Sequence, residues 1–276
     1  MSADDLDRHL DAYLAIREAL GLSVGAHARL LRDFVGHARA AGLPIRAGIA
    51  VAWACDAASP TCGAAGKAHR LSVARRFLNY LAAVLPGTEV PGPGMLPSPT
   101  RRRPYLFTPD EIGRLVAAAA TAPPRGTLRP IALSTLIGLL ASTGLRVGEA
   151  VRLTMADVRL DEEPANLRVL QTKFRKSRIV PLHPTTAAAL GHYCLQRQNL
   201  GYHALSDAFL VTERGGFHCP GLLNQWFAGL TRRLWPTDGG RRPCLHSLRH
   251  TFAVRRLEAW HAEGRDVSAL LPSLSV

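Results

Sequence analysis

The sequence lacks the cysteine spacing of a disulfide framework or of a zinc site. Its five cysteines are odd in number and scattered along the chain, and none lies in a CxxC or CxxC…HxxxH pattern. This argues against a disulfide-rich secreted fold and against a structural metal. We expect buried, inert thiols and a chain that works in a reducing cytoplasm.

We expect no segment for export or membrane insertion either. The first seven residues contain three aspartates and no basic residue, where a secretory or transit peptide would be basic and then apolar. The longest apolar run, residues 130–145, is bounded by Arg129 and Arg146 and interrupted by four hydroxyl side chains. It is too short and too polar to span a bilayer, so it predicts a buried helix.

Lysine is scarce, although the chain is strongly basic. Only 3 of the 34 basic residues are lysines, and the net charge is +13. Arginine favours bidentate phosphate contacts, but a GC-rich genome would give the same bias. Residues 1–88 carry a net charge of +3 and residues 89–276 a net charge of +10. Such an excess predicts a polyanionic partner, with nucleic acid preferred to a membrane surface.

A stretch rich in proline and glycine divides the chain. Residues 86–104 hold six prolines and three glycines, which cannot maintain a helix. This predicts a first domain over residues 1–86, a linker over 87–104 and a second domain over 105–276. In the first domain, apolar residues at helical spacing predict a bundle of four helices. These helices are expected over residues 6–20, 24–41, 45–57 and 67–84.

The fourth of these helices has a basic side. Arg70, Arg75 and Arg76 lie beside apolar residues in an amphipathic pattern. Contact with DNA and a merely solvated face are equally good interpretations of such a pattern.

The second domain is predicted to be mostly helical with a small antiparallel sheet. Thr108 followed by proline and acids predicts a helix start, and a further helix follows Pro130. A third is expected to contain Arg146, Glu149 and Leu153. Alternating residues predict a β-hairpin over 167–173 and 178–182 with a basic tip, in which Pro181 marks an edge strand. Later elements are expected as a short strand over 208–211 and helices over 185–198, 222–234 and 245–262.

Three short stretches could carry chemistry. They are residues 143–149 with the sequence TGLRVGE, the hairpin lysine Lys173, and residues 246–250 with the sequence HSLRH. Singly, each has an ordinary explanation, such as a surface ion pair or a solvated hairpin tip. Together, two arginines, a lysine and a histidine suit phosphate chemistry better than acyl, glycosyl or metal chemistry.

The stretches and their order resemble the tyrosine recombinases, the phage-integrase type of site-specific recombinase that includes Cre and the Xer proteins. That family has a TGxRxxE box, a hairpin lysine and an HxxRH box. Here Lys173 and His246 follow Arg146 by 27 and 100 positions. The resemblance implies a helical core-binding domain followed by a helical catalytic domain with a small sheet, and it covers nearly the whole chain.

The resemblance also implies a reaction. A tyrosine hydroxyl attacks a DNA phosphate, forms a 3′-phosphotyrosyl link and expels the 5′-hydroxyl. Arg146 and Arg249 would hold the non-bridging oxygens. Lys173, with Lys176 as a second choice, would protonate the leaving oxygen. Because the phosphotyrosine conserves the energy of the broken bond, no metal and no nucleotide cofactor is expected.

Three further residues receive supporting roles by resemblance. His246 would orient the phosphate or help to move the nucleophile's proton. Glu149 would hold Arg146 in place, and His250 is expected to pack behind the site as a buried structural residue. Candidate DNA contacts in the hairpin are Arg175, Lys176 and Arg178, which add to the basic helix of the first domain.

The match breaks after Arg249. The family continues with a Gly-His or Gly-Trp box and then the nucleophilic tyrosine, whereas here only His261 follows, after Trp260. All five tyrosines precede His246; they are Tyr13, Tyr80, Tyr105, Tyr193 and Tyr202. The sequence therefore resembles a recombinase truncated before that box, which binds double-stranded DNA but does not form the covalent intermediate alone.

Three functions stay open. The first is a recombinase or integrase that acts as a homo-oligomer on DNA in its complete form. The second is a non-catalytic DNA-binding remnant or regulator of recombination. The third, ranked lower, is a type IB topoisomerase, which shares the arginine, lysine and histidine chemistry. A membrane partner is not expected.

Overall fold

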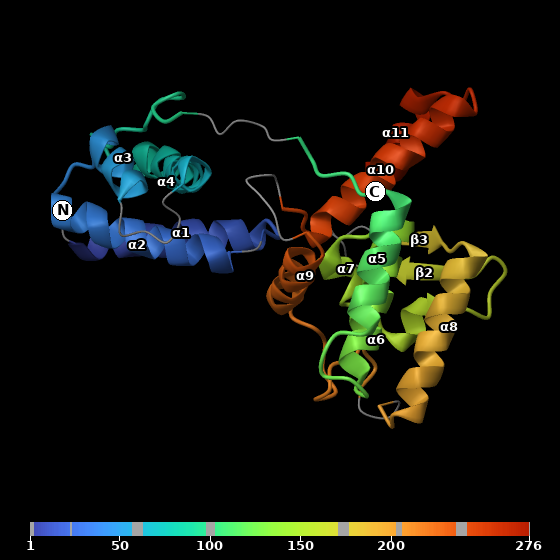
Figure 1. Cartoon of the computed structure of the whole chain (residues 1–276). Coiled ribbons are helices and arrows are strands. Elements are labelled where there is room, and N and C mark those ends of the chain that lie inside the picture. Colours follow the sequence, from blue (N-terminus) through green and yellow to red (C-terminus); the bar gives the residue numbers. More distant parts are fainter. Residues whose placement is uncertain are drawn as a thin grey trace. The chain divides into compact units, whose positions relative to one another are not determined.

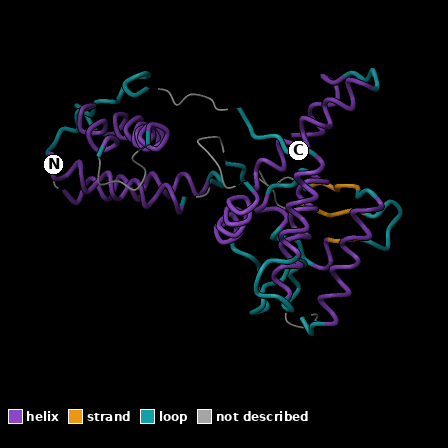
Figure 2. The backbone as a smooth tube through the Cα atoms, viewed as in Figure 1, coloured by secondary structure: helices purple, strands orange, loops and turns teal. Residues whose placement is uncertain are grey.

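The computed structural model describes residues 3–22, 24–56, 63–97, 103–170, 177–202, 206–235 and 242–275. The chain divides into two compact units, Met1–Arg102 and Arg103–Val276. Both units are mainly helical, and the second contains a small antiparallel sheet, as predicted (Figures 1 and 2).

The first unit is a bundle of four helices. They are α1 (Ala3–Ala19), α2 (Gly25–Ala41), α3 (Ala47–Cys55) and α4 (Ala64–Val84). Helix α2 contacts each of the other three. The centre of the unit is aromatic: Phe34, Trp53 and Phe77 are buried, and the rings of Phe34 and Trp53 lie 5.1 Å apart. The predicted helical spacing thus marked the faces that build this core.

Arg70 lies inside this bundle, which corrects its prediction as a DNA contact. Its guanidinium lies 4.0 Å from the centre of the Trp53 ring and donates a hydrogen bond of 2.8 Å to the Trp53 carbonyl. It also forms an ion pair with Asp33, and the whole residue is only 5% exposed. An arginine can be buried in this way because its planar group stacks on an aromatic ring while its N–H groups still find acceptors.

Much of the stretch expected to be a linker is packed on the first unit. Residues 87–97 run back along the bundle, where the backbone N–H of Glu89 donates to the Ile45 carbonyl at 2.9 Å. Arg75 donates from Nε and Nη2 to the carbonyls of Pro91 and Gly92, each at 2.8 Å. Proline removes backbone donors but keeps its carbonyl, so a side chain can still hold such a segment. Arg75 therefore ties this segment to the bundle, and its role as a DNA contact stays a prediction.

The second unit contains the remaining elements. They are α5 (Pro109–Ala120), α6 (Leu128–Thr143), α7 (Val147–Ala150), a 3₁₀ turn (Met155–Asp157), β1 (Val158–Arg159), β2 (Asn166–Val169), β3 (Arg178–Pro181), α8 (Pro184–Asn199), α9 (Pro220–Leu234), α10 (Leu245–Ala262) and α11 (Val267–Ser275). Helix α6 packs against α5, α8 and α10 and is buried on several sides. This explains why its sequence is apolar around much of the helix.

The start of α5 follows the sequence prediction closely. Thr108 is the N-cap, Pro109 is the first helical residue, and Glu111 completes a reciprocal capping box with Thr108. Two orphan donors of the first turn are satisfied by these side chains.

The sheet has three antiparallel strands in the order β1, β2, β3. Strand β3 is an edge strand, and its Pro181 pairs with Asn166 of β2, as Pro181 had indicated. The hairpin is confirmed, and its tip at residues 171–176 lies outside the described residues. The short strand expected over residues 208–211 is not a strand; Ala208 and Val211 each form an isolated bridge.

Two helices differ from the prediction. The helix expected around Arg146, Glu149 and Leu153 is only the single turn α7. Helix α11 was not predicted, and it carries Pro272 within it. Among the described helices, none combines the length and the apolar character needed to cross a membrane.

Candidate active site

A tight turn between α6 and α7 is the framework of the site. Helix α6 ends at Thr143, and its C-cap residue Gly144 has φ +65° in the left-handed region. A Cβ atom built on Gly144 would lie 2.3 Å from Cδ1 of Phe252 on α10, so this close approach requires glycine. The Gly144 carbonyl accepts a hydrogen bond from Nη1 of Arg249, also on α10. The turn therefore brings the TGLRVGE stretch and the HSLRH stretch together.

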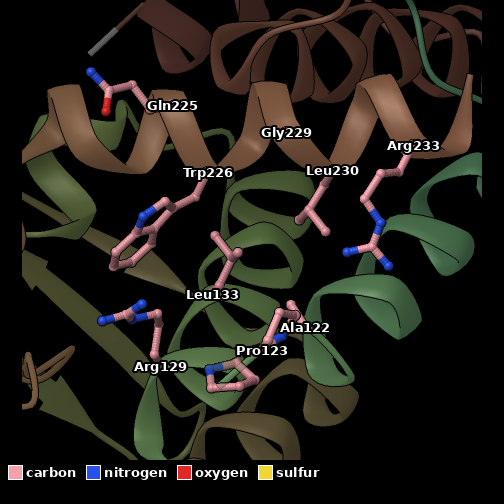
Figure 3. Close-up of a pocket in the computed structure, with 10 residues that line it drawn as sticks. Ala122, Pro123, Arg129, Leu133, Gln225, Trp226, Gly229, Leu230 and Arg233 are labelled. Atoms are coloured by element: carbon pink, nitrogen blue, oxygen red, sulfur yellow. The ribbon is translucent and has the colours of Figure 1, made fainter. Parts of the chain in front are cut away.

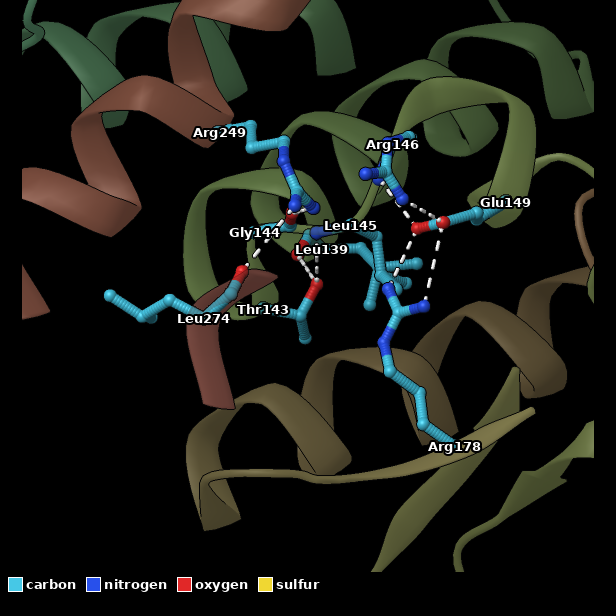
Figure 4. A network of polar contacts seen from close by, with 9 residues as sticks. All are labelled: Leu139, Thr143, Gly144, Leu145, Arg146, Glu149, Arg178, Arg249 and Leu274. Carbon is cyan, nitrogen blue, oxygen red and sulfur yellow. Dashed lines mark hydrogen bonds and ion pairs between the residues drawn. The ribbon is translucent and has the colours of Figure 1, made fainter. Parts of the chain in front are cut away.

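Glu149 holds Arg146 at two points. Its Oε1 accepts a hydrogen bond of 2.7 Å from Nη1 of Arg146, and its Oε2 accepts one of 3.0 Å from the backbone N–H of the same residue. Arg146 is the N-cap of α7, so Glu149 satisfies a free donor of the helix and orients a guanidinium at once (Figure 4). The role that the resemblance implied for Glu149 agrees with this geometry.

A second arginine reaches the same carboxylate. Arg178 of β3 donates from Nη2 to Oε2 of Glu149 at 2.8 Å, and the two side chains are 13% and 3% exposed (Figure 4). Burial by itself raises the pKa of the Glu149 carboxyl, but hydrogen bonds from Arg178 and Arg146 outweigh it and leave the pKa below its usual value. Glu149 is therefore a buried anion between two cations.

Arg249 completes the arginine pair. It is half-buried, and its Nη2 lies 3.5 Å from the Leu274 carbonyl of α11. Burial and the nearby charge of Arg146 lower the pKa of the Arg249 guanidinium, which Glu149 opposes. An arginine stays protonated through such a shift, so two positive charges face one region of the unit.

His246 lies in the field of both arginines. Partial burial comes first among the causes that lower its pKa, followed by the charges of His250, Arg249 and Arg146. The rings of His246 and His250 are 4.5 Å apart and nearly perpendicular. His250 is half-buried rather than fully buried, whereas His246 is exposed. A lowered pKa keeps the His246 ring neutral near pH 7, where it can accept or donate a proton.

Not every predicted site residue is placed here. Lys173, Arg175 and Lys176 lie outside the described residues. Arg178 was predicted to contact DNA, but its guanidinium is mostly buried against Glu149, so the structure corrects that interpretation. The sequence held one signal: strand alternation places Arg178 on the same side as Val180, while Ile179 is 67% exposed.

Contacts to the segment before α5 hold α10 in place, and no sequence pattern predicted them. Thr251 Oγ1 accepts a hydrogen bond of 2.9 Å from the backbone N–H of Phe107. Arg255 Nη2 donates to the carbonyl of the same residue at 2.7 Å. Helix α10 therefore presents His246 and Arg249 from a fixed position.

Two tyrosines of this unit are engaged in structural hydrogen bonds. The Tyr105 hydroxyl donates to Glu111 at 2.6 Å, and the Tyr193 hydroxyl accepts from the backbone of Val211 at 3.1 Å. Burial raises the pKa of each phenol to about 12, helped at Tyr105 by the Glu111 carboxylate. Neither hydroxyl has the depressed pKa that would favour a phenolate nucleophile.

A separate hollow lies between α9 and the start of α6 (Figure 3). It encloses about 290 Å³, and none of the predicted site residues lines it. Its Arg129 lies 4.8 Å from the centre of the Trp226 ring and forms an ion pair of 3.0 Å with Glu213. The hollow is thus distinct from the cluster of Arg146, His246 and Arg249.

The fold and this cluster together define a class of protein. A helical bundle precedes a helical unit with a small sheet, and the second unit carries two arginines beside a histidine. Residues 106–268 match the Phage integrase family. The chain belongs to this family.

Relatives with known names support this membership. The chain is 38% identical over 274 residues to the integrase/recombinase y4rB of Sinorhizobium fredii (strain NBRC 101917 / NGR234), covering 95% of this chain and 85% of that protein. It is 31% identical over 179 residues to the tyrosine recombinase XerD of Listeria innocua serovar 6a (strain ATCC BAA-680 / CLIP 11262), covering 63% of this chain and 56% of that one.

Solved structures support the fold. The Tn1549 transposon integrase in complex with a circular intermediate DNA has a TM-score of 0.68 at 16% identity, covering 96% of this chain and 89% of that one. A lambda integrase tetramer bound to a Holliday junction has a TM-score of 0.64 at 19% identity, covering 96% of this chain and 75% of that one. The predicted fold class is confirmed.

Proposed function

We propose that this chain binds duplex DNA and holds one backbone phosphate with Arg146, His246 and Arg249, as part of site-specific cutting and rejoining. The observation that supports this most directly is the hydrogen bond from Arg249 to the Gly144 carbonyl, which brings the HSLRH stretch beside the turn that carries Arg146, about a hundred positions earlier. Guanidinium groups match phosphate oxygens in shape and charge, and their effect is greatest where negative charge develops in a transition state.

The contacts of these side chains suggest a role for each group. Glu149 accepts from Arg146, and the Gly144 and Leu274 carbonyls accept from Arg249, so the remaining N–H groups of the two arginines are left to bind phosphate. His246, kept neutral by its surroundings, would orient the phosphate or pass on the nucleophile's proton. By its place in the family pattern, Lys173 would protonate the leaving 5′-oxygen.

The nucleophile is a separate question. None of the five tyrosines in this sequence follows Arg249, and two of them are held in structural hydrogen bonds. We therefore propose that these 276 residues do not form the phosphotyrosyl link alone. Two functions fit: a recombinase part whose tyrosine comes from elsewhere, such as a neighbouring subunit, or a regulator that occupies recombination sites without cutting them.

One experiment separates these functions. The chain is incubated with nicked duplexes taken from the DNA that flanks its own gene, with and without an intact relative whose own arginines are inactivated. We expect no detergent-resistant adduct from the chain alone. An adduct that forms only in the mixture supports donation of a tyrosine by the other subunit, and no adduct in either case supports the regulator. An adduct formed by the chain alone would contradict the proposal that these residues do not form the phosphotyrosyl link.

The proposed setting follows from the family. The partner is double-stranded DNA of a mobile element or chromosome, the active form is a homo-oligomer on DNA, and the place of action is the cytoplasm. Relaxation of a supercoiled plasmid without recombination sites would instead favour the topoisomerase.

A further inference from the structure

One face of α9 builds the hollow that lies between this helix and the start of α6. The lining residues of α9 stand at positions 225, 226, 229, 230 and 233, a helical spacing that puts them on the same side of the helix. Leu133 of α6 and Pro123 of the segment before α6 line the other side (Figure 3). The volume of about 290 Å³ is close to the lower limit of ligand pockets, roughly 300 Å³, so the hollow has room for a small molecule.

Gly229 keeps the middle of this face open. It lies in the interior of α9, and a Cβ atom built on it would meet no atom within 4 Å outside its own stretch of helix. A glycine inside a helix is less favourable than an alanine, because it loses more backbone freedom on folding. Here the missing side chain leaves free space on the helix face between Trp226 and Arg233.

The aromatic wall of the hollow is held in place by its neighbours. The guanidinium of Arg129 lies 4.8 Å from the centre of the Trp226 ring, and its Nη2 pairs with Glu213 at 3.0 Å. The ring of His218, which is only 6% exposed, approaches the Trp226 ring edge-on with the centres 6.0 Å apart. Trp226 therefore offers a preformed surface to an apolar ligand, and the charge of Arg129 is already balanced by a carboxylate.

Arg233 brings a positive charge that the described part of the chain does not neutralise. Its side chain points from α9 into the hollow (Figure 3). Among the described residues, the ion pairs of the second unit do not include Arg233, and none of the residues that line the hollow is acidic. One cation beside an apolar surface suits a ligand with one anionic group and an apolar body.

We propose that this hollow is a binding site for a small aromatic carboxylate. The Arg233 guanidinium pairs with the carboxylate, since its fork of N–H groups matches two carboxylate oxygens. Trp226, Leu133 and Leu230 contact the aromatic body. The site shares no lining residue with the cluster of Arg146, His246 and Arg249, so the inference is independent of the proposed action on DNA.

The test uses the full chain with 2-naphthoate as the probe. Isothermal titration calorimetry gives the affinity, and we expect a Kd of about 1 mM or lower. The neutral analogue 2-naphthamide keeps the rings but lacks the charge, so it should bind roughly tenfold more weakly. The indole N–H signals of the four tryptophans in an NMR spectrum locate the site. The signal of Trp226, assigned with Trp226→Phe, should shift, whereas that of Trp53 in the first unit should stay in place.

Two variants with matched controls test the residues. Gly229→Leu fills the hollow and should abolish binding, whereas Gly113→Leu adds the same side chain at an exposed glycine of α5 that also has open space but does not line the hollow. Arg233→Gln should weaken binding roughly tenfold. Arg232→Gln removes the charge of the adjacent exposed arginine, which does not line the hollow, and should leave the affinity unchanged. Urea unfolding of every variant separates loss of the ligand from loss of the fold.

Each outcome decides one claim. The site is supported if the folded variants Gly229→Leu and Arg233→Gln lose affinity for 2-naphthoate while both controls keep it. It is overturned if the parent chain does not bind the probe, if either folded variant binds as tightly as the parent, or if the controls lose as much. Equal affinity for 2-naphthamide would overturn the role of the carboxylate. None of these results bears on the proposed function, which the detergent-resistant adduct tests.

Discussion

Arg178 of β3 and Glu149 of α7 form a buried ion pair, with Nη2 and Oε2 at 2.8 Å, across 29 positions of sequence. Through the same carboxylate, the strand that leaves the hairpin is joined to Arg146. This pair links the edge strand of the sheet to the turn between α6 and α7, which carries Arg146. Lys173 belongs to the same hairpin as that edge strand. We expect it to position Arg146 and to contribute strongly to the fold of the second unit.

Replacing the central carboxylate tests this link. Glu149→Gln leaves two guanidiniums near each other without the anion between them. We expect a loss of about 3 kcal/mol in the free energy of unfolding, measured by urea denaturation, because removal of one partner strands buried charges. Glu263→Gln removes a carboxylate from an exposed pair with Arg265 and should change stability little. A similar small change in both variants would contradict the role of Glu149.

Acid should weaken the second unit through the same residue. The pKa of Glu149 in the folded chain lies below its ordinary value, so the folded state keeps this carboxyl ionised at a pH where the unfolded state has protonated it. The stability that this provides is present above the unfolded pKa and is lost as the pH falls through the folded one. Urea midpoints measured from neutral pH downward should fall more steeply for the parent chain than for Glu149→Gln. Parallel curves would show that Glu149 is not the titrating group.

The role of Arg178 is tested by its coupling to Arg146. If Arg178→Leu weakens DNA binding through the orientation of Arg146, the losses from Arg178→Leu and Arg146→Ala should not add in the double variant. Anisotropy with a duplex gives the affinities for this double-mutant cycle. Arg178→Lys should recover only part of the loss, because lysine cannot repeat the forked contact.

Arg168 gives the matched control for this cycle. It lies on the neighbouring strand β2, is exposed, and pairs with Glu162 rather than with Glu149. Arg168→Gln and Arg146→Ala should therefore have additive effects. Additive losses for Arg178→Leu as well would mean that Arg178 acts on DNA independently of Arg146.

Local signals in the sequence predicted most of the fold. The capping residues at Thr108, the apolar run of α6 and the alternation around the hairpin each act within a few residues, so pattern alone found them. The three motif stretches likewise predicted Arg146, His246 and Arg249 as one site, and the hydrogen bond from Arg249 to the Gly144 carbonyl joins the two stretches that carry them.

What the sequence missed depends on partners distant in the chain. Arg70 looked like a surface charge because its acceptor, the Trp53 carbonyl, lies 17 positions away on another helix. Arg75 holds a proline-rich segment whose packing no local pattern reveals. Arg178 was placed among DNA contacts because its partner Glu149 belongs to a different motif. A charged side chain can stabilise the core or bind a ligand, and only its neighbours in the folded chain show which of the two it does.

Gly144 sets the distance between α10 and the turn that joins α6 to α7, so its replacement should be costly. Gly144→Ala would force a side chain into the left-handed region, which costs roughly 1–2 kcal/mol per residue, and would also drive a methyl group into the Phe252 ring. Gly126 is the matched control, because it has φ +77° but open space around its Cβ position. Urea unfolding should show a larger loss for Gly144→Ala than for Gly126→Ala. In a Phe252→Ala background, Gly144→Ala should lower the free energy of unfolding only as much as Gly126→Ala does. The clash with the ring is then gone, and only the cost of the left-handed backbone remains. Equal losses for the two glycines in the parent chain would mean that the ring of Phe252 moves aside freely, and Arg249 would then not owe its position to this contact.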